Sequence, residues 1–545
     1  MMIECARHGE RHGERVERVN GKKYTLRSRV FSFSHRARRM SEGMHVKCTW
    51  NAFHRKMRRE TELIHASFIA RARIRPRVRV AMVVHASSRT LAFVVARSSF
   101  ARARIRPDAR ARALRVAFVS WDWPERDASA AGVRTMAIAD ALRARGHDVV
   151  VLACANADLV GRGKVIGEGY VATRVEANRG RATRAAFEDV NPDVVVFDRF
   201  IAEEAFGAIV RQEFPRCVRV LDMQDAHCVR RARQSAKAGA GACATPPRAN
   251  DVDTMRELAA VWRSDLALVC SRIEMTWLTN ACGVAKAKVR EASFFYDGVE
   301  APKAESVRGD FDRRSGFATI GTFKHAPNVD SVEWLASEVW PLVRARLPDA
   351  TMDVYGSYPN AKVERFHAPE RGFRIRGRAE SLKDTLSAPR VLLAPLRFGA
   401  GIKGKVLDAW THGLPVVTTP IGSEATVPGE VEFWTPASAP VTPSAGWGGF
   451  GDCVTAQELA DAAVRVHEDY ETWREAQANG AKIMNELFSH DVNMPPLIEA
   501  IESAAANIDE IRANDYVGQS LWYHTERSTL YFSKWIELKE TGANT

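Results

Sequence analysis

From residue 114 onward, short apolar runs alternate with segments in which apolar residues recur every three or four positions. The run LRVAFVS at 114–120 is typical of a strand that is buried on both faces of a parallel sheet. After a polar loop, the pattern at 133–154 predicts an amphipathic helix, a stop at Gly146 and a second buried strand. Strand, helix and strand in this order form a βαβ unit, so the sequence predicts a parallel sheet here.

The same alternation continues and predicts two series of strands. The first series adds strands at 194–200, 217–227 and 266–271, with a helix at 272–281. The second series is expected to have strands at 317–323, 352–358, 373–381, 390–398 and 415–420, and helices at 329–346, 403–411, 454–487 and 494–512. Residues 301–315 are polar and are predicted to be an irregular linker. The predicted fold class is α/β, with two Rossmann-like, doubly wound domains that face each other across a cleft.

These patterns also predict how the chain is divided. We expect a basic low-complexity extension at 1–112, a first Rossmann-like domain at 113–303, a second at 304–487 and a helical tail at 488–545. The tail is expected to pack back on the body, and its aromatic residues are interpreted as core residues: Trp522, Tyr523, Tyr531 and Trp535.

Charge separates the first 112 residues from the rest. The whole chain has a formal net charge of +13, but residues 1–112 hold 28 Lys and Arg against 8 Asp and Glu. The remaining residues are therefore mildly acidic, with a net charge of −7. A protein that binds nucleic-acid phosphates needs a basic face on its folded domain, so we expect no nucleic-acid partner.

The basic extension is predicted to be disordered, because charged residues interrupt every apolar pattern in it. It contains a local repeat, FIARARIRP at 68–76 and FARARIRPDAR at 100–110. Three interpretations stay open: an organelle transit peptide, a solvated basic tail, or an over-extended reading frame. Acidic residues near Met1 count against a transit peptide that begins there, and the segment from Met82 fits better.

Composition excludes several other classes of protein. Apolar residues make up 46% and charged residues 27%, which is ordinary for a globular protein. No run of about 18 apolar residues occurs, so no transmembrane segment is predicted. The nine cysteines are odd in number and form no C-x-x-C pair, so neither a disulfide framework nor a zinc site is indicated. A reducing compartment is the simplest interpretation.

The most informative segment is a glycine loop at 397–425, RFGAGIKGKVLDAWTHGLPVVTTPIGSEA. A buried strand is expected to end near its start, and Gly399, Gly401 and Gly404 then form a loop that opens a helix. Such a loop lets backbone N–H groups approach an anion at a helix N-terminus.

Charged side chains follow the glycines. Lys403 and Lys405 add positive charge, and Asp408 lies three residues after Lys405, on the same side of the helix. A carboxylate in that place can accept hydrogen bonds from two ribose hydroxyls. The combination predicts a nucleotide site, and the alternative is a capped helix with Asp408 in its favourable first turn.

Three other motif matches are interpreted as incidental. Gly399 to Lys405 fits G-x-x-x-x-G-K, but Val406 stands where a P-loop needs Ser or Thr to hold magnesium. The segment GRGKVIG at 161–167 is not placed between a strand and a helix, and is predicted to be a surface loop. The D-x-D match at 251–253 is predicted to be solvated or to cap a helix, so no metal site is predicted.

With these residues the chain resembles the GT-B-fold retaining glycosyltransferases of the large family-four group, the glycosyl transferases group 1. The shared pattern is a glycine–basic–lysine loop, a carboxylate and then x-G-x-P-V-V-T-T: Gly401, Lys403, Lys405, Asp408, Gly413 and 415–419. The resemblance covers roughly 113–512, including GHDVVVL at 146–152 and TIGTFKHAPNVDSVEWL at 319–335.

The resemblance implies that the nucleotide binds in the second half and the acceptor in the first. Asp408 matches the carboxylate on the ribose, although the family usually has Glu there. Lys405, with Lys403, matches the basic group that stabilises the departing diphosphate. Gly132 matches a glycine of the first loop, close to the donor phosphates, and His227 matches a histidine near the transferred sugar.

Other positions near this site are less specific. Asp225 and Arg230 are compatible with an interdomain ion pair, and His227 with a purely structural histidine. Lys324 and Asn328 lie where the second half opens toward the predicted cleft, and base recognition is expected near Arg376 to Arg378, so that Lys324 and Arg378 are counted with the nucleotide-sugar site. Ala400 stands where many members have the first glutamate of a Glu-x₇-Glu pair, a departure that bears on sugar recognition.

The predicted function is transfer of a hexosyl group from a nucleotide-diphosphate sugar to an unidentified glycan, lipid or small-molecule acceptor. Retention of configuration is expected, with no metal and no other cofactor. The expected location is the cytoplasm, or an organelle stroma or matrix if the extension is a transit peptide. Two alternatives stay open, because fold does not determine function: a non-catalytic GT-B-fold binding or scaffold protein, and a sugar-nucleotide epimerase on the same fold.

Overall fold

The computed structural model describes residues 17–19, 22–24, 112–124, 130–154, 163–165, 170–177, 180–236, 245–300, 304–427 and 446–542. The chain divides into two compact units, residues 1–105 and 106–545. In the first unit, β1 (Glu17–Val19) pairs antiparallel with β2 (Lys22–Tyr24). The predicted disorder of the basic extension, up to residue 111, otherwise lies outside the described residues.

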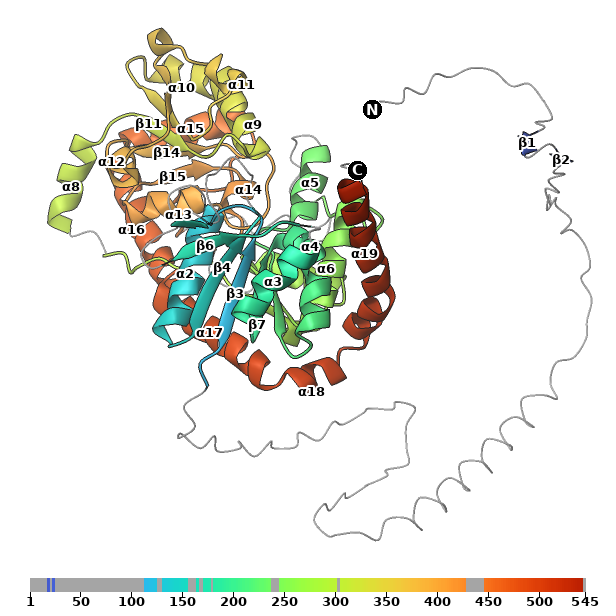
Figure 1. Ribbon diagram of the computed structural model, residues 1–545. Helices are drawn as coiled ribbons and strands as arrows, with labels where there is room; N and C mark the ends of the chain where they lie inside the picture. The colour runs from blue at the N-terminus through green and yellow to red at the C-terminus, as the bar shows by residue number, and fades with distance from the viewer. Residues whose placement is uncertain are drawn as a thin grey trace, which may run out of the picture. The chain divides into compact units, whose positions relative to one another are not determined.

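The first half of the second unit is built on an eight-stranded sheet (Figure 1). The strands are β3 (Arg115–Ser120), β4 (Asp148–Ala153), β5 (Gly163–Val165), β6 (Val171–Arg174), β7 (Val194–Asp198), β8 (Val218–Asp222), β9 (Leu266–Val269) and β10 (Val289–Glu291). Their order is β10-β9-β8-β7-β3-β4-β6-β5, and every pair is parallel except β5 with β6. The prediction of a surface loop at 161–167 was therefore wrong for residues 163–165, which form an edge strand. The order runs outward from β3 in both directions, as in a doubly wound sheet.

The helices of this half are α2 (Ala130–Ala144), α3 (Gly180–Val190), α4 (Arg199–Glu213), α5 (His227–Ser235), α6 (Val252–Arg263) and α7 (Arg272–Thr276), with π-helical Trp277–Ala281 after α7. Gly146 follows α2 with φ +93°, a conformation that glycine adopts without a Cβ clash. The predicted helix stop thus has a backbone cause.

Successive residues of the central strands enter two different hydrophobic clusters. Ala117 and Val119 of β3 belong to one cluster, while Val116 and Phe118 belong to the other. Side chains alternate between the two faces of a strand, so both faces of this sheet are covered. This two-sided burial is the physical reason for the continuous apolar runs in the sequence.

The second half contains a six-stranded parallel sheet with the order β13-β12-β11-β14-β15-β16. Its strands are β11 (Phe317–Ile320), β12 (Met352–Tyr355), β13 (Phe373–Gly377), β14 (Val391–Ala394), β15 (Val416–Thr418) and β16 (Gly449–Phe450). Its helices are α8 (Ala304–Arg313), α9 (Ala326–Trp334), α10 (Trp340–Arg346), α11 (Ala361–Glu364), α12 (Leu382–Ser387), α13 (Gly404–Thr411), α14 (Pro420–Ser423), α15 (Ala456–Glu468) and α16 (Tyr470–Leu487). The predicted α/β fold class, with two Rossmann-like halves, is confirmed.

The segment expected to be an irregular linker is mostly helical. Residues Ala304–Arg313 form α8, and the side chains of Val307 and Phe311 are buried. These two residues are four positions apart and lie on one face of the helix, which packs into the core of the second half. The prediction missed α8 because only two apolar residues mark this face.

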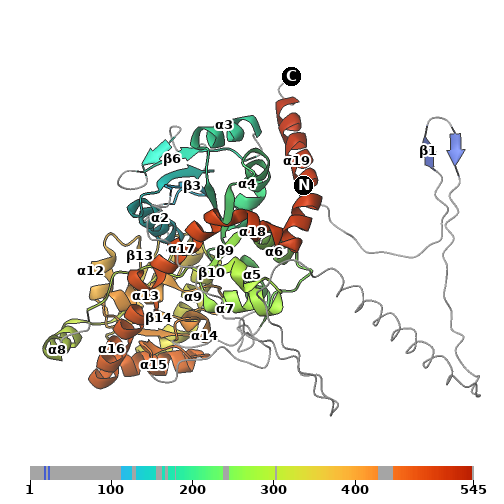
Figure 2. The same cartoon turned by 90° about the horizontal axis from the view of Figure 1, so that it is seen from below.

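Three helices at the end of the chain return to the first half (Figures 1 and 2). They are α17 (His490–Ala506), α18 (Ile508–Ala513) and α19 (Tyr516–Gly542). Met494, Leu497 and Ile501 of α17 belong to the same cluster as Val116 and Phe118 of β3. One face of the first sheet is thus covered by a helix that lies almost 400 residues later in the sequence. None of the helices in the described part of the chain is long and apolar enough to cross a membrane.

The predicted role of the tail aromatics as core residues was right for Trp522 alone. Its side chain is 2% exposed, and its Nε1 donates a hydrogen bond to the Arg263 carbonyl at 2.7 Å. Tyr523, Tyr531 and Trp535 are 71%, 65% and 54% exposed. These three side chains are exposed, so the aromatic content of the segment misled the prediction.

Candidate functional site

The glycine loop joins β14 to α13 at the carboxyl end of the second sheet, where ligands bind in open parallel sheets. Gly401 has φ +62°, and a Cβ placed on it would lie 2.7 Å from the Cys270 Sγ and 3.2 Å from the Asp225 Cβ. Only glycine therefore allows this close approach to the first half. Lys403 is the N-cap residue of α13, so the helix begins directly after the loop and points its free N–H groups toward it.

The first half meets the loop with the start of α2. A Cβ on Gly404 would lie 3.4 Å from the Ala130 Cβ, in the first turn of α2. Gly132, the predicted phosphate-approaching glycine, is buried in this same turn. The structure thus brings the first turns of α2 and α13, with Gly132 and Gly404, against one another.

Lys405 lies in the first turn of α13 and is partly exposed. Its Nζ donates a hydrogen bond to the Asn328 Oδ1 at 2.8 Å, and the Asn328 Nδ2 donates to the Thr322 carbonyl at 2.8 Å. Burial lowers the pKa of Lys405 to about 8, against the opposing effect of Asp408. The ammonium group is therefore still largely charged at neutral pH, and Asn328 holds it in place.

Asp408 lies one turn further along α13 and is hydrogen-bonded to the first half. The Tyr296 hydroxyl donates to the Asp408 Oδ1 at 2.8 Å. Burial raises the pKa of Asp408 to about 6, although Tyr296, His412 and Lys405 act in the opposite direction. The carboxylate is ionised at neutral pH, but its charge is poorly solvated and available to accept further hydrogen bonds.

Lys403 has different surroundings from Lys405, although the two are two residues apart. Its side chain is 9% exposed, its Nζ donates to the Gly401 carbonyl, and it lies 3.4 Å from the Glu424 Oε2. Glu424 also pairs with Arg233 of α5. The positive charge of Lys403 is therefore balanced inside the protein, whereas Lys405 has a neutral amide as its hydrogen-bond acceptor.

His227 is the first residue of α5, just after β8. Its ring packs edge-on against Phe200 at 5.6 Å between centroids, and its Nε2 lies 3.4 Å from the Asp225 Oδ1. Burial lowers the pKa of His227 to about 4, so the imidazole is neutral at pH 7. Asp225 also pairs with Arg230, and because both belong to the first half, their pair is not interdomain.

The loop between β11 and α9 brings charges of the two halves together at His325. Burial lowers the pKa of His325 below its ordinary value, and the positive charges of Arg230 and Lys405 lower it further. The negative charge of Asp225 acts in the opposite direction. These opposing effects come from the first half (Arg230, Asp225) and from α13 (Lys405). His325 thus lies near both predicted groups of site residues.

Lys324 and Arg378 also lie at the carboxyl edge of the second sheet, and Arg378 is the further of the two from the glycine loop. Lys324 follows β11, and its Nζ lies 3.7 Å from the centroid of the Tyr358 ring. Arg378 follows β13 and is exposed. Because β13 is three strands from β14, Arg378 begins roughly 14 Å from the glycine loop. This is the side on which base recognition was expected.

Sequence reasoning missed three residues that contact the loop and α13. Tyr296 and Arg233 come from the first half and had no signal in the local pattern. Glu424 lies within the glycine-loop segment at 397–425, but its burial and its pairing with Lys403 are visible only in the structure. Ala400 is buried and packs in the core cluster of the first half, so it offers no polar group.

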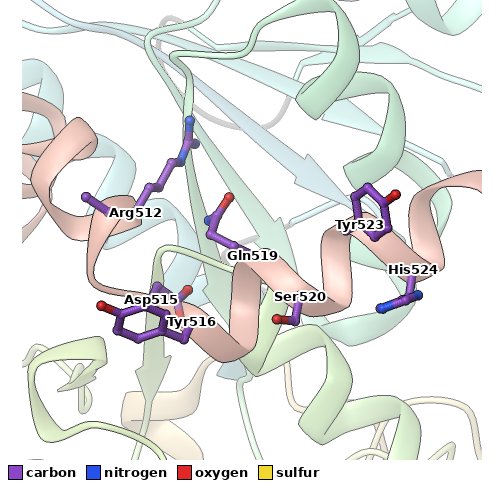
Figure 3. Close-up of a pocket in the computed structure, with 8 residues that line it drawn as sticks. Arg512, Asp515, Tyr516, Gln519, Ser520, Tyr523 and His524 are labelled. Atoms are coloured by element: carbon purple, nitrogen blue, oxygen red, sulfur yellow. The ribbon is translucent and has the colours of Figure 1, made fainter.

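A separate cavity of about 390 Å³ lies at the junction of α18 and α19 (Figure 3). All of its lining residues come from 512–524, and none of the predicted site residues is among them. Its charged side chains are already paired, Arg512 with Asp265 and Asp515 with Lys288. It does not belong to the site around the glycine loop.

Residues 314–446, which include the glycine loop and α13, match the family model of the glycosyl transferases group 1. The match lies in the second half of the chain and covers less than half of the whole sequence. No curated protein matches the sequence significantly.

Solved structures resemble about 70% of the chain. Sucrose-phosphate synthase from Thermosynechococcus elongatus is 16% identical, with a TM-score of 0.54 over 72% of this chain and 99% of that one. The catalytic domain of starch synthase IV from Arabidopsis thaliana, bound to ADP and acarbose, is 12% identical, with a TM-score of 0.49 over 72% of this chain and 100% of that one. HepE from Anabaena in complex with UDP-glucose is 13% identical, with a TM-score of 0.48 over 71% of this chain and 99% of that one. At 16% identity the likeness to sucrose-phosphate synthase shows the fold alone, which is GT-B. Together with the group 1 domain, this fold supports a glycosyltransferase.

Proposed function

We propose that the protein transfers a hexosyl group from a nucleotide-diphosphate sugar to a hydroxyl acceptor, with retention of configuration. One observation supports this most: a glycine loop opens the N-terminus of α13, with Lys405 and Asp408 on its first turns, inside the group 1 domain. Helix N-terminus, cation and carboxylate match diphosphate followed by ribose. The acceptor is a glycan, a lipid or a small molecule that binds on the first half.

Each site residue has a role in this proposal. The amides of Gly399, Gly401 and Gly404 and the ammonium group of Lys405 bind the diphosphate. A diphosphate beside Lys405 would raise its pKa from about 8 and keep it charged. Asp408 accepts hydrogen bonds from the ribose hydroxyls, with Tyr296 holding its other side.

The groups around the sugar and the base complete the site. Gly132 lets the start of α2 approach the phosphates, and Lys324 and Arg378 contact the nucleotide further out. His227 is neutral, so it can donate or accept a hydrogen bond at a sugar hydroxyl without adding charge. Lys403, paired with Glu424, shapes the loop and acts on the phosphate only through the loop.

The reaction breaks the bond between the anomeric carbon and the diphosphate oxygen and forms a bond from that carbon to the acceptor oxygen. The acceptor proton passes to the departing phosphate oxygen on the same face, which retains the configuration. Negative charge grows on the leaving group, and Lys405 and the N–H groups at the start of α13 are preorganised to stabilise it. No metal or other cofactor forms part of the proposal. The protein would act in the cytoplasm, or inside an organelle if the extension is a transit peptide.

A scaffold role is the second candidate, because Ala400 is buried where a sugar-binding carboxylate would be expected from the resemblance. Thermal unfolding of the full chain with UDP, GDP, ADP, CDP and their sugars separates the candidates. A nucleotide at about 100 times its Kd stabilises the protein by roughly 2.7 kcal/mol. No stabilisation by any nucleotide would favour the scaffold. If a nucleotide-sugar stabilises the protein, incubation with that sugar and analysis of the products follow, and an isomerised donor sugar would favour the epimerase.

The matching donor then tests catalysis through Lys405. Lys405→Ala should lower kcat by about 10²- to 10³-fold, since it removes one preorganised donor to the leaving group. Lys482→Ala, on the exposed side of α16, is the control and should leave kcat unchanged. Full activity of Lys405→Ala would show that the diphosphate binds elsewhere.

A further inference from the structure

One buried arginine of the first half contacts the glycine loop of the second. Arg233, in the last turn of α5, has a side chain that is 1% exposed. Its Nη1 donates to the Gly399 carbonyl at 2.6 Å and to the Glu424 Oε2 at 2.9 Å, and its Nη2 donates to the Glu424 Oε1 at 2.5 Å. The guanidinium group is thus fixed by a bidentate carboxylate and by the first residue of the loop.

The network around this arginine is ionised and buried. Burial alone would raise the pKa of Glu424, but Arg233 and Lys403 hold that pKa below its ordinary value. Removal of one partner would leave an uncompensated charge inside the protein, which is strongly destabilising locally. Glu424, Lys403 and Gly399 all belong to the second half, so Arg233 is the group through which α5 enters this network.

Each end of α5 carries a residue that matters for the proposed reaction. His227 begins the helix, and Arg233 lies near its end. The backbone N–H groups of His227 and Cys228 donate to the Glu257 carboxylate at 3.0 and 2.9 Å, which anchors the start of α5 within the first half. A rigid helix that is anchored at one end and bound to the glycine loop at the other sets the distance between His227 and the loop.

We propose that Arg233 is a positioning residue for sugar transfer: with Glu424 it holds the glycine loop in place relative to His227. This inference rests on the proposed function. Lys405 and Asp408 both lie on α13, so their contacts with the nucleotide do not depend on α5, and only the contacts of the loop amides would be affected by a loss of Arg233. The reacting sugar and acceptor need groups of both halves, and a displacement of about 1 Å can cost about 100-fold in rate.

Arg233→Lys tests the proposal, because lysine keeps the charge but cannot bind the Gly399 carbonyl and both carboxylate oxygens in the same way. The matched control is Arg219→Lys. Arg219 is also almost fully buried and binds both oxygens of Asp265, within the first half and away from the loop. Both variants should lower the midpoint of thermal unfolding.

Only Arg233→Lys should lower kcat, by about 10- to 100-fold, and this loss should exceed the accompanying rise in the Kd of the nucleotide, to which the loop amides contribute. Equal kcat values in the two variants would show that Arg233 only adds stability. A parallel loss of nucleotide affinity would place its effect on donor binding and overturn the positioning role.

Hydrogen exchange of the free protein separates this inference from the proposed function. Arg233→Lys should accelerate exchange of the amides at 399–404 by about 10-fold or more relative to the wild type and to Arg219→Lys. Unchanged exchange would overturn the inference even in an active enzyme. If the wild type transfers no sugar from any donor, the proposed function fails, and the exchange rates still decide whether Arg233 holds the loop.

Discussion

Replacement of Asp408 by asparagine should stabilise the free protein and weaken nucleotide binding. In the folded state, burial raises the pKa of Asp408 from 3.8 to about 6. The folded protein therefore holds the proton more tightly than the unfolded chain does. The ionised carboxylate reduces stability at all pH values above about 6, and this cost disappears as the pH falls toward 4.

The size of the effect follows from the two pKa values. Their difference corresponds to about 3 kcal/mol in favour of the neutral form. The side chain is partly exposed and keeps its hydrogen bond from Tyr296, so we expect roughly 1–2 kcal/mol of stabilisation in Asp408→Asn at pH 7.5. A hydrogen bond to a charged acceptor contributes about 1.5–3 kcal/mol, so nucleotide affinity should fall by about 10- to 100-fold.

Thermal unfolding at pH 7.5 and pH 4.5 measures the first effect, and titration calorimetry with the nucleotide measures the second. The stabilisation should be present at pH 7.5 and largely lost at pH 4.5. Asp193→Asn is the control with the opposite sign, because hydrogen bonds from Arg115 hold the pKa of Asp193 below its ordinary value despite burial. A destabilised Asp408→Asn at pH 7.5, or one with wild-type nucleotide affinity, would refute the assignment of Asp408.

Two further predictions concern the loop and the tail. Gly401→Ala should destabilise the protein by about 1–3 kcal/mol and lower activity, because its Cβ would lie 2.7 Å from the Cys270 Sγ at φ +62°. The control is Gly283→Ala, at φ +72°, where an added Cβ would have no atom within 4 Å. Chemical denaturation should show a loss of only about 1 kcal/mol in its free energy of unfolding. Equal losses of stability in the two variants would argue against tight packing at Gly401. Trp522→Ala should lower the free energy of unfolding by about 3–5 kcal/mol. Trp535→Ala should change it by no more than about 0.5 kcal/mol. Similar thermal midpoints for the two tryptophan variants would contradict their different burial.

Local patterns predicted the fold because burial constrains every position of a strand. Within the predicted strands at 114–120 and 390–398, residues 116–119 and 391–394 are apolar without interruption, as required for strands with helices on both faces, and both lie in strands of the structure. Gly146 ends α2 for a backbone reason that can be read from a single residue. The amphipathic pattern failed where few residues carried it, as in α8, whose buried face rests on Val307 and Phe311.

The candidate site was predictable as a segment but not as a set of interactions. Lys403 and Lys405 look equivalent in the sequence, yet Lys403 pairs with Glu424 while Lys405 binds Asn328. The difference arises because Lys403 precedes α13 and Lys405 is its second residue, so that their side chains point into different surroundings. Those surroundings are made by α5, whose Arg233 pairs with Glu424, and by α9, which carries Asn328, and both helices are distant in sequence from the loop.

The sequence by itself determined the two α/β halves, the glycine loop at the end of a strand, and the residue types that suit a diphosphate and a ribose. It did so because strand burial and helix opening depend on residues that are close together in the chain. Only the tertiary structure decided that Arg233 binds the loop, that Tyr296 binds Asp408, and that three of the four tail aromatics are exposed. These contacts join elements up to 191 residues apart, and their formation depends on how helices pack around the two sheets rather than on any local pattern.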